Sequence, residues 1–169
     1  MGTAFFYSVS RYARQMVPLS TVFILIIVSA TPLAFVGNSS VFPYLNIVAV
    51  FYWSLYRPDR LPILGILAVG IFQDLLLGTM IGFMPILFLI AHGSTVSQRR
   101  LLLGKSFYFI WLGFTIICGI TSLIAWGLLS LLVGQTAEVV ALLVKLGMTI
   151  SSFPIMFWVL GRLHRSFMD

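Results

Sequence analysis

Long apolar stretches without ionisable side chains are the feature that most limits what this chain can fold into. The longest, residues 106–133, contains no Asp, Glu, Lys or Arg, and about 20 apolar residues are enough to cross a bilayer as a helix. Over all 169 residues, 60% are hydrophobic and 8% are charged, whereas a typical soluble domain has about 25% charged residues. Such a composition excludes both a water-soluble domain and a disordered polar chain. It predicts an all-α, polytopic membrane protein with a single integral membrane domain, residues 1–169.

Turn-forming and charged segments divide the chain into six apolar stretches, and each is predicted to cross the membrane as a helix. The second and the fourth are short for a membrane span, which requires a thinner bilayer around them or aromatic residues at their ends. The loops between the stretches are too short to hold a soluble domain, so any function must lie within the bundle. The predicted spans of this six-helix transmembrane bundle are residues 17–36, 41–56, 61–77, 83–97, 106–133 and 137–160.

The basic residues support six crossings. If the N-terminus lies in the cytoplasm, nine of the ten Lys and Arg residues fall on the cytoplasmic side, and the tenth, Lys145, lies inside the sixth span. Cytoplasmic loops of membrane proteins are enriched in Lys and Arg. Without the short second span this bias would be lost, so we count that stretch as a crossing. With six crossings and this charge bias, we expect both termini in the cytoplasm. The nine residues are Arg11, Arg14, Arg57, Arg60, Arg99, Arg100, Lys105, Arg162 and Arg165.

The first apolar stretch shares some features with a secretory signal peptide, because Arg11 and Arg14 precede it and small residues lie near Ala30. However, an apolar core of about 20 residues is long for a signal peptide, which favours a retained span. Thr31-Pro32 also interrupts the segment that resembles a cleavage site. We therefore expect residues 17–36 to remain in the protein as its first helix.

Three ionisable side chains, Asp74, His92 and Lys145, fall inside the predicted spans. A charge at the bilayer centre costs roughly 2.5–3.5 kcal/mol on insertion scales, so each needs a partner. Asp74 and Lys145 lie at similar depth, and one hypothesis is an ion pair between the third and sixth spans. The alternative is that Lys145 extends to the outer interface while the adjacent glycine turn caps Asp74. For His92, a hydrogen bond to a hydroxyl or carbonyl group is favoured over a proton relay.

Glycine recurs every four residues around Asp74, in the pattern Gly70-x-x-x-Asp74-x-x-x-Gly78-x-x-x-Gly82. This spacing places Gly70, Asp74 and Gly78 near one face of a helix, where a neighbouring helix can approach closely. Gly78 and Gly82 are predicted to form a tight outer turn that uses positive φ angles. The candidate residues for helix packing or partner contact are Gly70, Asp74, Gly78, Gly82, Asn46 and Lys145.

From about residue 43 to residue 92, the order of features resembles the MreD family of bacterial rod shape-determining membrane proteins. The first and last predicted helices agree with the family only in hydropathy, and Lys145 lies outside the matching residues. The residues that carry the resemblance are Pro43, Asn46, Arg57-Pro58-Asp59-Arg60, Gly65, Gly70, Phe72, Asp74-Leu75, Gly78 and Gly82.

The resemblance implies a non-enzymatic scaffold of the cell-elongation (rod) complex in the bacterial inner membrane. Members of this family associate with MreC, a single-span protein with a periplasmic domain. Through MreC they link MreB filaments to the membrane glycan polymerase and transpeptidase that build peptidoglycan and maintain cell shape. The implied six-helix fold is similar to that of the substrate-binding subunits of energy-coupling-factor transporters. The alternative function is therefore a small-solute (vitamin-like) binding subunit, although the short outer loops have no charged or aromatic cluster to close over a ligand.

The residue types present do not suggest catalysis. Nucleophilic catalysis needs a Ser or Cys beside a positioned base, and metal-assisted hydrolysis needs several His or carboxylate ligands. The two histidines and four acids are distributed over both sides of the membrane, and Cys118 is the only cysteine. We therefore expect no enzymatic activity, cofactor, metal or nucleic-acid partner.

Overall fold

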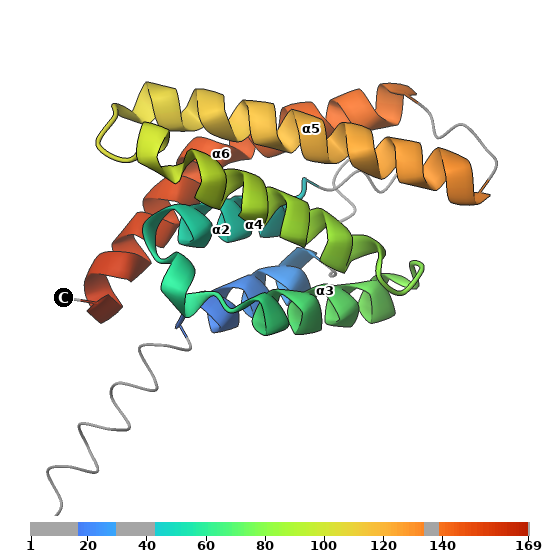
Figure 1. Ribbon diagram of the computed structural model, residues 1–169, viewed down its shortest axis with the longest axis horizontal. Coiled ribbons are helices and arrows are strands. Elements are labelled where there is room, and N and C mark those ends of the chain that lie inside the picture. Colours follow the sequence, from blue (N-terminus) through green and yellow to red (C-terminus); the bar gives the residue numbers. More distant parts are fainter. Residues whose placement is uncertain (1–16, 30–42, 134–138, 169) are drawn as a thin grey trace, which may run out of the picture.

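The computed structural model describes residues 17–29, 43–133 and 139–168, and the regular secondary structure in these ranges is helical throughout. Figure 1 shows the arrangement of these helices. The prediction of an all-α chain is confirmed for this part of the protein. The elements are the helix Val17–Ser29, α2 (Leu45–Tyr56), the 3₁₀ turn η1 (Pro58–Arg60), α3 (Ile63–Leu77), α4 (Phe83–Leu102), α5 (Phe107–Val133) and α6 (Val139–Met168).

The helices follow the predicted apolar stretches, and two of them continue beyond the ends of the predicted spans. The helix α4 continues beyond residue 97 through Arg99 and Arg100, and α6 continues beyond residue 160 to Met168. Arg is a good helix former, so a charged residue by itself does not end a helix. The chain reverses after α4 only at Gly104, whose φ is 81°. Residues 30–36, 41–42 and 137–138 of the predicted spans lie outside the described residues.

Two helices are long and apolar enough to cross a membrane, over Phe107–Leu131 in α5 and Leu142–Ser166 in α6. Val17–Ser29, α2 and α3 are apolar but shorter. The 12 residues of α2 extend about 18 Å at the helical rise per residue, compared with a hydrocarbon core of about 30 Å. Length and composition therefore identify two candidate spans in the described ranges, and the six-span bundle remains a prediction.

The helix α2 forms the centre of the structure, and every residue from Asn46 to Leu55 is buried. It packs against α4 and α6, while α4 also packs against α3 and α5 (Figure 1). The ring of Phe51 contacts the rings of Phe114 in α5 and Phe153 in α6, at centroid distances of 5.2 and 5.8 Å. Apolar residues all around α2 are explained by this position, because neighbours cover it on every side.

The C-terminal ends of α2, α4 and α6 lie together. Arg99 of α4 donates from Nε to the backbone carbonyl of Leu55 at 2.8 Å, so a cation caps the negative end of α2. The ring of His164 in α6 stacks on Trp53 at 5.5 Å. We call this end of the structure the basic end, because it collects Arg57, Arg60, Arg99, Arg100, Lys105, Arg162 and Arg165.

The helices α3 and α4 form a close hairpin. A Cβ atom at Gly70 would lie 2.7 Å from both the Cα and the N of Pro85. The two backbones can approach this closely because glycine has no side chain. Between the helices, Gly78 and Gly82 have φ angles of 64° and 102°. These left-handed conformations are readily available only to glycine, which is why the chain can reverse here.

The contact at Gly70 predicts that the substitution Gly70→Ala lowers the free energy of unfolding by about 1–3 kcal/mol, because backbone atoms cannot move aside cheaply. Gly93→Ala in α4 is the matched control, since a Cβ there would meet nothing within 4 Å, and it is expected to be neutral or stabilising. Thermal unfolding of the two variants in the same detergent checks this. Equal transition temperatures would contradict the proposed packing.

Candidate functional site

The buried polar groups around the α3–α4 turn form the candidate site, at the end of α3 opposite to the basic end. Asp74, in the last turn of α3, has 0% exposure. The hydroxyl of Thr79 donates to its Oδ1 at 2.7 Å. The backbone N–H of Gly82 donates to Oδ2 at 2.8 Å, and that of Met84 donates to Oδ1 at 3.1 Å. The carboxylate thus receives three hydrogen bonds from a turn that is close in sequence.

Asp74 also completes the hydrogen bonding at the start of α4. The first N–H groups of a helix have no acceptor within that helix. Those of Gly82 and Met84 donate to Asp74, and that of Phe83 donates to a turn carbonyl at 3.1 Å. The next residue, Pro85, has no N–H to satisfy. Because a helix N-terminus carries partial positive charge, this position also favours the negative charge of the carboxylate.

A second polar contact lies beside this turn and joins three helices. Asn46 of α2 donates from Nδ2 to the Oε1 of Gln73 in α3 at 3.0 Å, and Ser29 Oγ lies 3.5 Å from Asn46 Oδ1. Asn46 and Gln73 are both buried, so each amide needs the other to offset its loss of water. The sequence candidates include Asn46 but not its partner Gln73. Gln73 could have been identified from the sequence, because it is an amide side chain within a largely apolar helix.

Lys145 does not pair with Asp74, so the hypothesis of an ion pair is wrong. Its Nζ instead lies 4.6 Å from the centroid of the Tyr44 ring, a cation–π contact. Tyr44 is held there because its backbone N–H donates to Thr149 Oγ1 at 3.0 Å, one turn along α6 from Lys145. Of the alternative, the capping of Asp74 by the glycine turn is confirmed, while the extension of Lys145 to the outer interface stays a prediction. The turn donors already occupy the carboxylate, which leaves no need for a distant cation.

The predicted hydrogen bond of His92 to a hydroxyl group is confirmed. His92 Nδ1 lies 2.7 Å from Ser54 Oγ, and Ser54 Oγ donates to the carbonyl of Val50 at 2.5 Å. A hydroxyl has a single proton to donate, so His92 must donate from Nδ1 to Ser54. This assignment places the proton of a neutral ring on Nδ1, and it joins α4 to the buried centre of α2.

The chemistry of these groups is that of a structural polar core. In the described ranges, no group of three or more His, Cys, Asp or Glu side chains is placed to hold a metal ion. The carboxylate of Asp74 and the amides of Asn46 and Gln73 point into contacts between helices. Of the candidate residues, Gly70 lies at the α3–α4 contact, Gly78 and Gly82 form the turn, and Lys145 rests on Tyr44.

No protein-family model, no curated protein and no solved structure matches the chain.

The bonding of Asp74 predicts that Asp74→Leu lowers the free energy of unfolding by at least about 2 kcal/mol, because each buried donor left unsatisfied costs about 1–3 kcal/mol. The matched control is Asp59→Asn, which removes the charge of an exposed acid at the basic end and is expected to have little effect. Thermal unfolding of both purified variants tests the difference. A wild-type transition in Asp74→Leu would show that the turn does not depend on the carboxylate.

Proposed function

We propose that this chain is a non-enzymatic membrane scaffold of the bacterial cell-elongation (rod) complex and resembles the MreD family in function as well as in sequence. In this proposal it binds MreC and helps couple MreB filaments to the membrane glycan polymerase and transpeptidase. It crosses the inner membrane six times, with both termini in the cytoplasm. The observation that carries the proposal is that several residues of the resemblance lie where α2, α3 and α4 meet, namely Asn46, Gly70, Asp74, Gly78 and Gly82.

Several of these residues have a physical role in the bundle. Gly65 brings α3 against the helix Val17–Ser29, since a Cβ there would lie 2.7 Å from Leu19 Cδ2. Phe72 stacks on Phe23 of that helix at 4.6 Å. The pattern from Gly70 to Gly82 builds the α3–α4 hairpin and its buried carboxylate. A chain that shares the family's fold is expected to use the family's residues in such contacts.

The direction of the helices supports six crossings. The helices α2, α4 and α6 end at the basic end, whereas α3 and α5 begin there, directly after η1 and the α4–α5 turn. Val17–Ser29 also begins near it, because Thr21 Oγ1 accepts a hydrogen bond from Trp53 Nε1 at 2.8 Å. Alternating directions gather the basic residues on one side, which is the charge distribution of a multi-pass protein with a cytoplasmic basic face.

The shortness of α2 is compatible with a crossing. Lipid does not surround this helix, because its residues from Asn46 to Leu55 are buried by other helices. Backbone that leaves helical geometry at membrane depth is tolerated where protein covers it. The longer helices around α2 then form the surface that meets the hydrocarbon.

The outer surface is apolar, as a membrane-embedded scaffold requires. Leu64 in α3 is 78% exposed and Leu131 in α5 is 84% exposed, and only 11% of an apolar 18-residue stretch of α6 is buried. Soluble proteins rarely expose contiguous apolar patches of more than a few hundred Å². Since the polar core faces inward, the proposed contact with a single-span partner is made by these apolar helix faces.

The proposed topology predicts which turns are accessible from outside the cell. In a Cys118→Ala background, Ile81→Cys in the exposed α3–α4 turn is expected to react with a membrane-impermeant maleimide on intact spheroplasts. Lys105→Cys, in the exposed α4–α5 turn, is expected to react only after permeabilisation. Both residues are exposed in short turns between helices, so the fold itself shields neither position. Labelling of Lys105→Cys from outside would overturn the six-crossing arrangement.

The proposed partner is tested by affinity purification of the tagged protein in mild detergent, followed by mass spectrometry. We expect a single-span MreC-like protein and wall-synthesis enzymes with the wild type, and a large loss with Asp74→Leu, whose α3–α4 hairpin is disrupted. Asp59→Asn is the control and should retain them. Absence of these proteins from the wild-type sample would overturn the scaffold proposal. A retained small solute in their place would favour the alternative, a transporter subunit.

A further inference from the structure

The basic end has a large excess of positive charge. Among the described residues it carries seven basic side chains and one acidic side chain, Asp59. Part of this charge serves the fold, since Arg99 caps α2 and the guanidinium of Arg162 lies 5.5 Å from the Trp158 ring. Arg100 and Lys105, like Arg57, take no part in such contacts. Both are exposed, and neither side chain has a hydrogen bond or ion pair within the described part of the chain.

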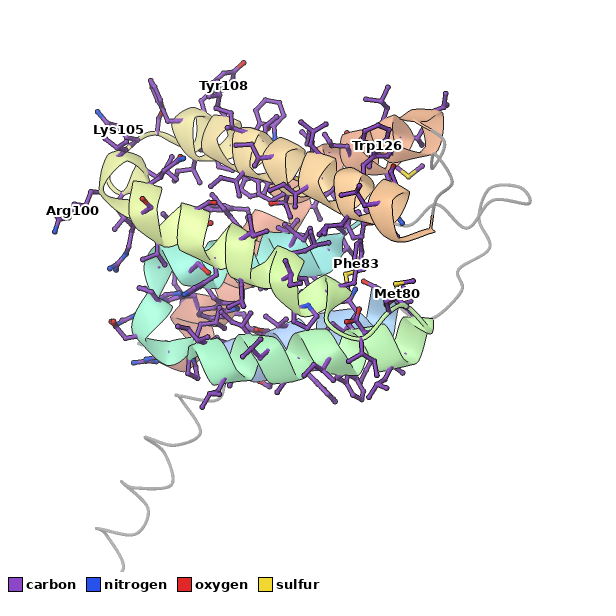
Figure 2. The ribbon with its side chains drawn as sticks, turned by 45° about the vertical axis from the view of Figure 1, so that its right-hand side comes forward. Met80, Phe83, Arg100, Lys105, Tyr108 and Trp126 are labelled. Atoms are coloured by element: carbon purple, nitrogen blue, oxygen red, sulfur yellow. The ribbon has the colours of Figure 1, made fainter. Side chains whose placement is uncertain are left out.

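Arg100 and Lys105 lie on either side of the short turn that joins α4 to α5. The turn closes because Gly104 adopts a φ of 81° and the N–H of Lys105 donates to the carbonyl of Leu102 at 3.3 Å. Figure 2 shows both side chains projecting outward from the same end of the structure, with Tyr108 on the adjoining first turn of α5. Two exposed cations are thus presented at the same end of the structure, each without a counter-ion among the described residues.

Exposed side chains with large apolar parts lie close in sequence to these two cations. Leu101 is 71% exposed and Phe109 is 61% exposed, while Tyr108 is 67% exposed. A soluble anion would gain no contact from these apolar side chains. A phospholipid would, because its phosphate can bind the cations while its acyl chains cover the leucine and phenylalanine side chains. Tyrosine favours the interface between headgroups and acyl chains.

We propose that the α4–α5 turn binds an anionic phospholipid, with its phosphate group held by Arg100 and Lys105. The Arg100 guanidinium offers paired donors to the phosphate oxygens, and Lys105 adds a second positive charge. An anionic headgroup is selected over a zwitterionic one because no acidic side chain of the turn is present to balance a choline-type ammonium group. This inference rests on the membrane location proposed above, but it does not depend on MreC or on any other protein partner.

The orientation of the chain in the membrane does not by itself account for this turn. A cytoplasmic bias in Lys and Arg can orient a membrane protein wherever those residues lie in the short loops. It requires neither two exposed cations at one turn nor exposed apolar residues close to them in sequence. Removing both charges should therefore leave the topology unchanged while it weakens lipid binding, which separates the two roles.

The test uses the full-length protein, purified in detergent, and native mass spectrometry with added phosphatidylglycerol or phosphatidylcholine. We expect the wild type to retain phosphatidylglycerol in preference to phosphatidylcholine. The double variant Arg100→Gln/Lys105→Gln should bind phosphatidylglycerol about 30-fold more weakly, from the usual attraction of two basic side chains to an anionic surface. Lys145→Gln, which removes a charge near the opposite end of α6, is the matched control and should bind like the wild type.

Three results would overturn the proposal: wild-type phosphatidylglycerol binding by the double variant, equal retention of both lipids, or displacement of the lipid by the same concentration of inorganic phosphate. The last would identify a soluble anion as the ligand. If the double variant fails to unfold cooperatively, Arg100→Lys/Lys105→Arg replaces it and should retain selective binding. In the wild type, retention must also fall with added salt. Because no partner is present, these outcomes are independent of the affinity purification.

Discussion

The carboxylate of Asp74 is the interaction on which the α3–α4 hairpin depends. An acidic side chain with 0% exposure is costly unless hydrogen-bond donors surround it, and here the turn itself supplies three of them. The same bonds satisfy the first N–H groups of α4, so both the buried carboxylate and these N–H groups have hydrogen-bond partners. Gly70 then allows the two helices to close to backbone contact. The hairpin in turn provides α4, which carries His92 and Arg99 to the buried helix α2.

Polar chemistry is divided between the two ends of the molecule, and the division has a physical basis. At one end, Asp74, Asn46 and Gln73 are enclosed by helices and bond to one another or to the turn. At the other, long basic side chains reach carbonyl groups, aromatic rings or the surface. Enclosed groups fix how helices pack, whereas exposed cations remain available to outside ligands. In our proposals, the first end therefore stabilises the scaffold and the second meets the lipid headgroups.

Much of the helical architecture could be predicted from the sequence, because it follows from local properties. The end of α3 at Gly78 and the turn through Gly82 depend on backbone conformations that glycine supplies. The helices α4 and α6 continue beyond the ends of the predicted spans, because arginine and histidine residues can continue a helix. Comparisons of depth along two helices also suggested a pair between Asp74 and Lys145. Depth says nothing about which faces meet, and the nearer donors of the turn occupy the carboxylate instead.

The sequence by itself determined the helical class, the glycine turn and the identity of the groups that need partners. These properties depend on each residue and its near neighbours, so they can be read without knowing the fold. The tertiary structure alone decided which partners those groups receive, such as Gln73 for Asn46, Ser54 for His92 and Tyr44 for Lys145. It also decided that Arg99 caps α2 while Arg100 and Lys105 stay exposed. Such choices depend on how helices distant in sequence rotate and pack, which no local pattern specifies.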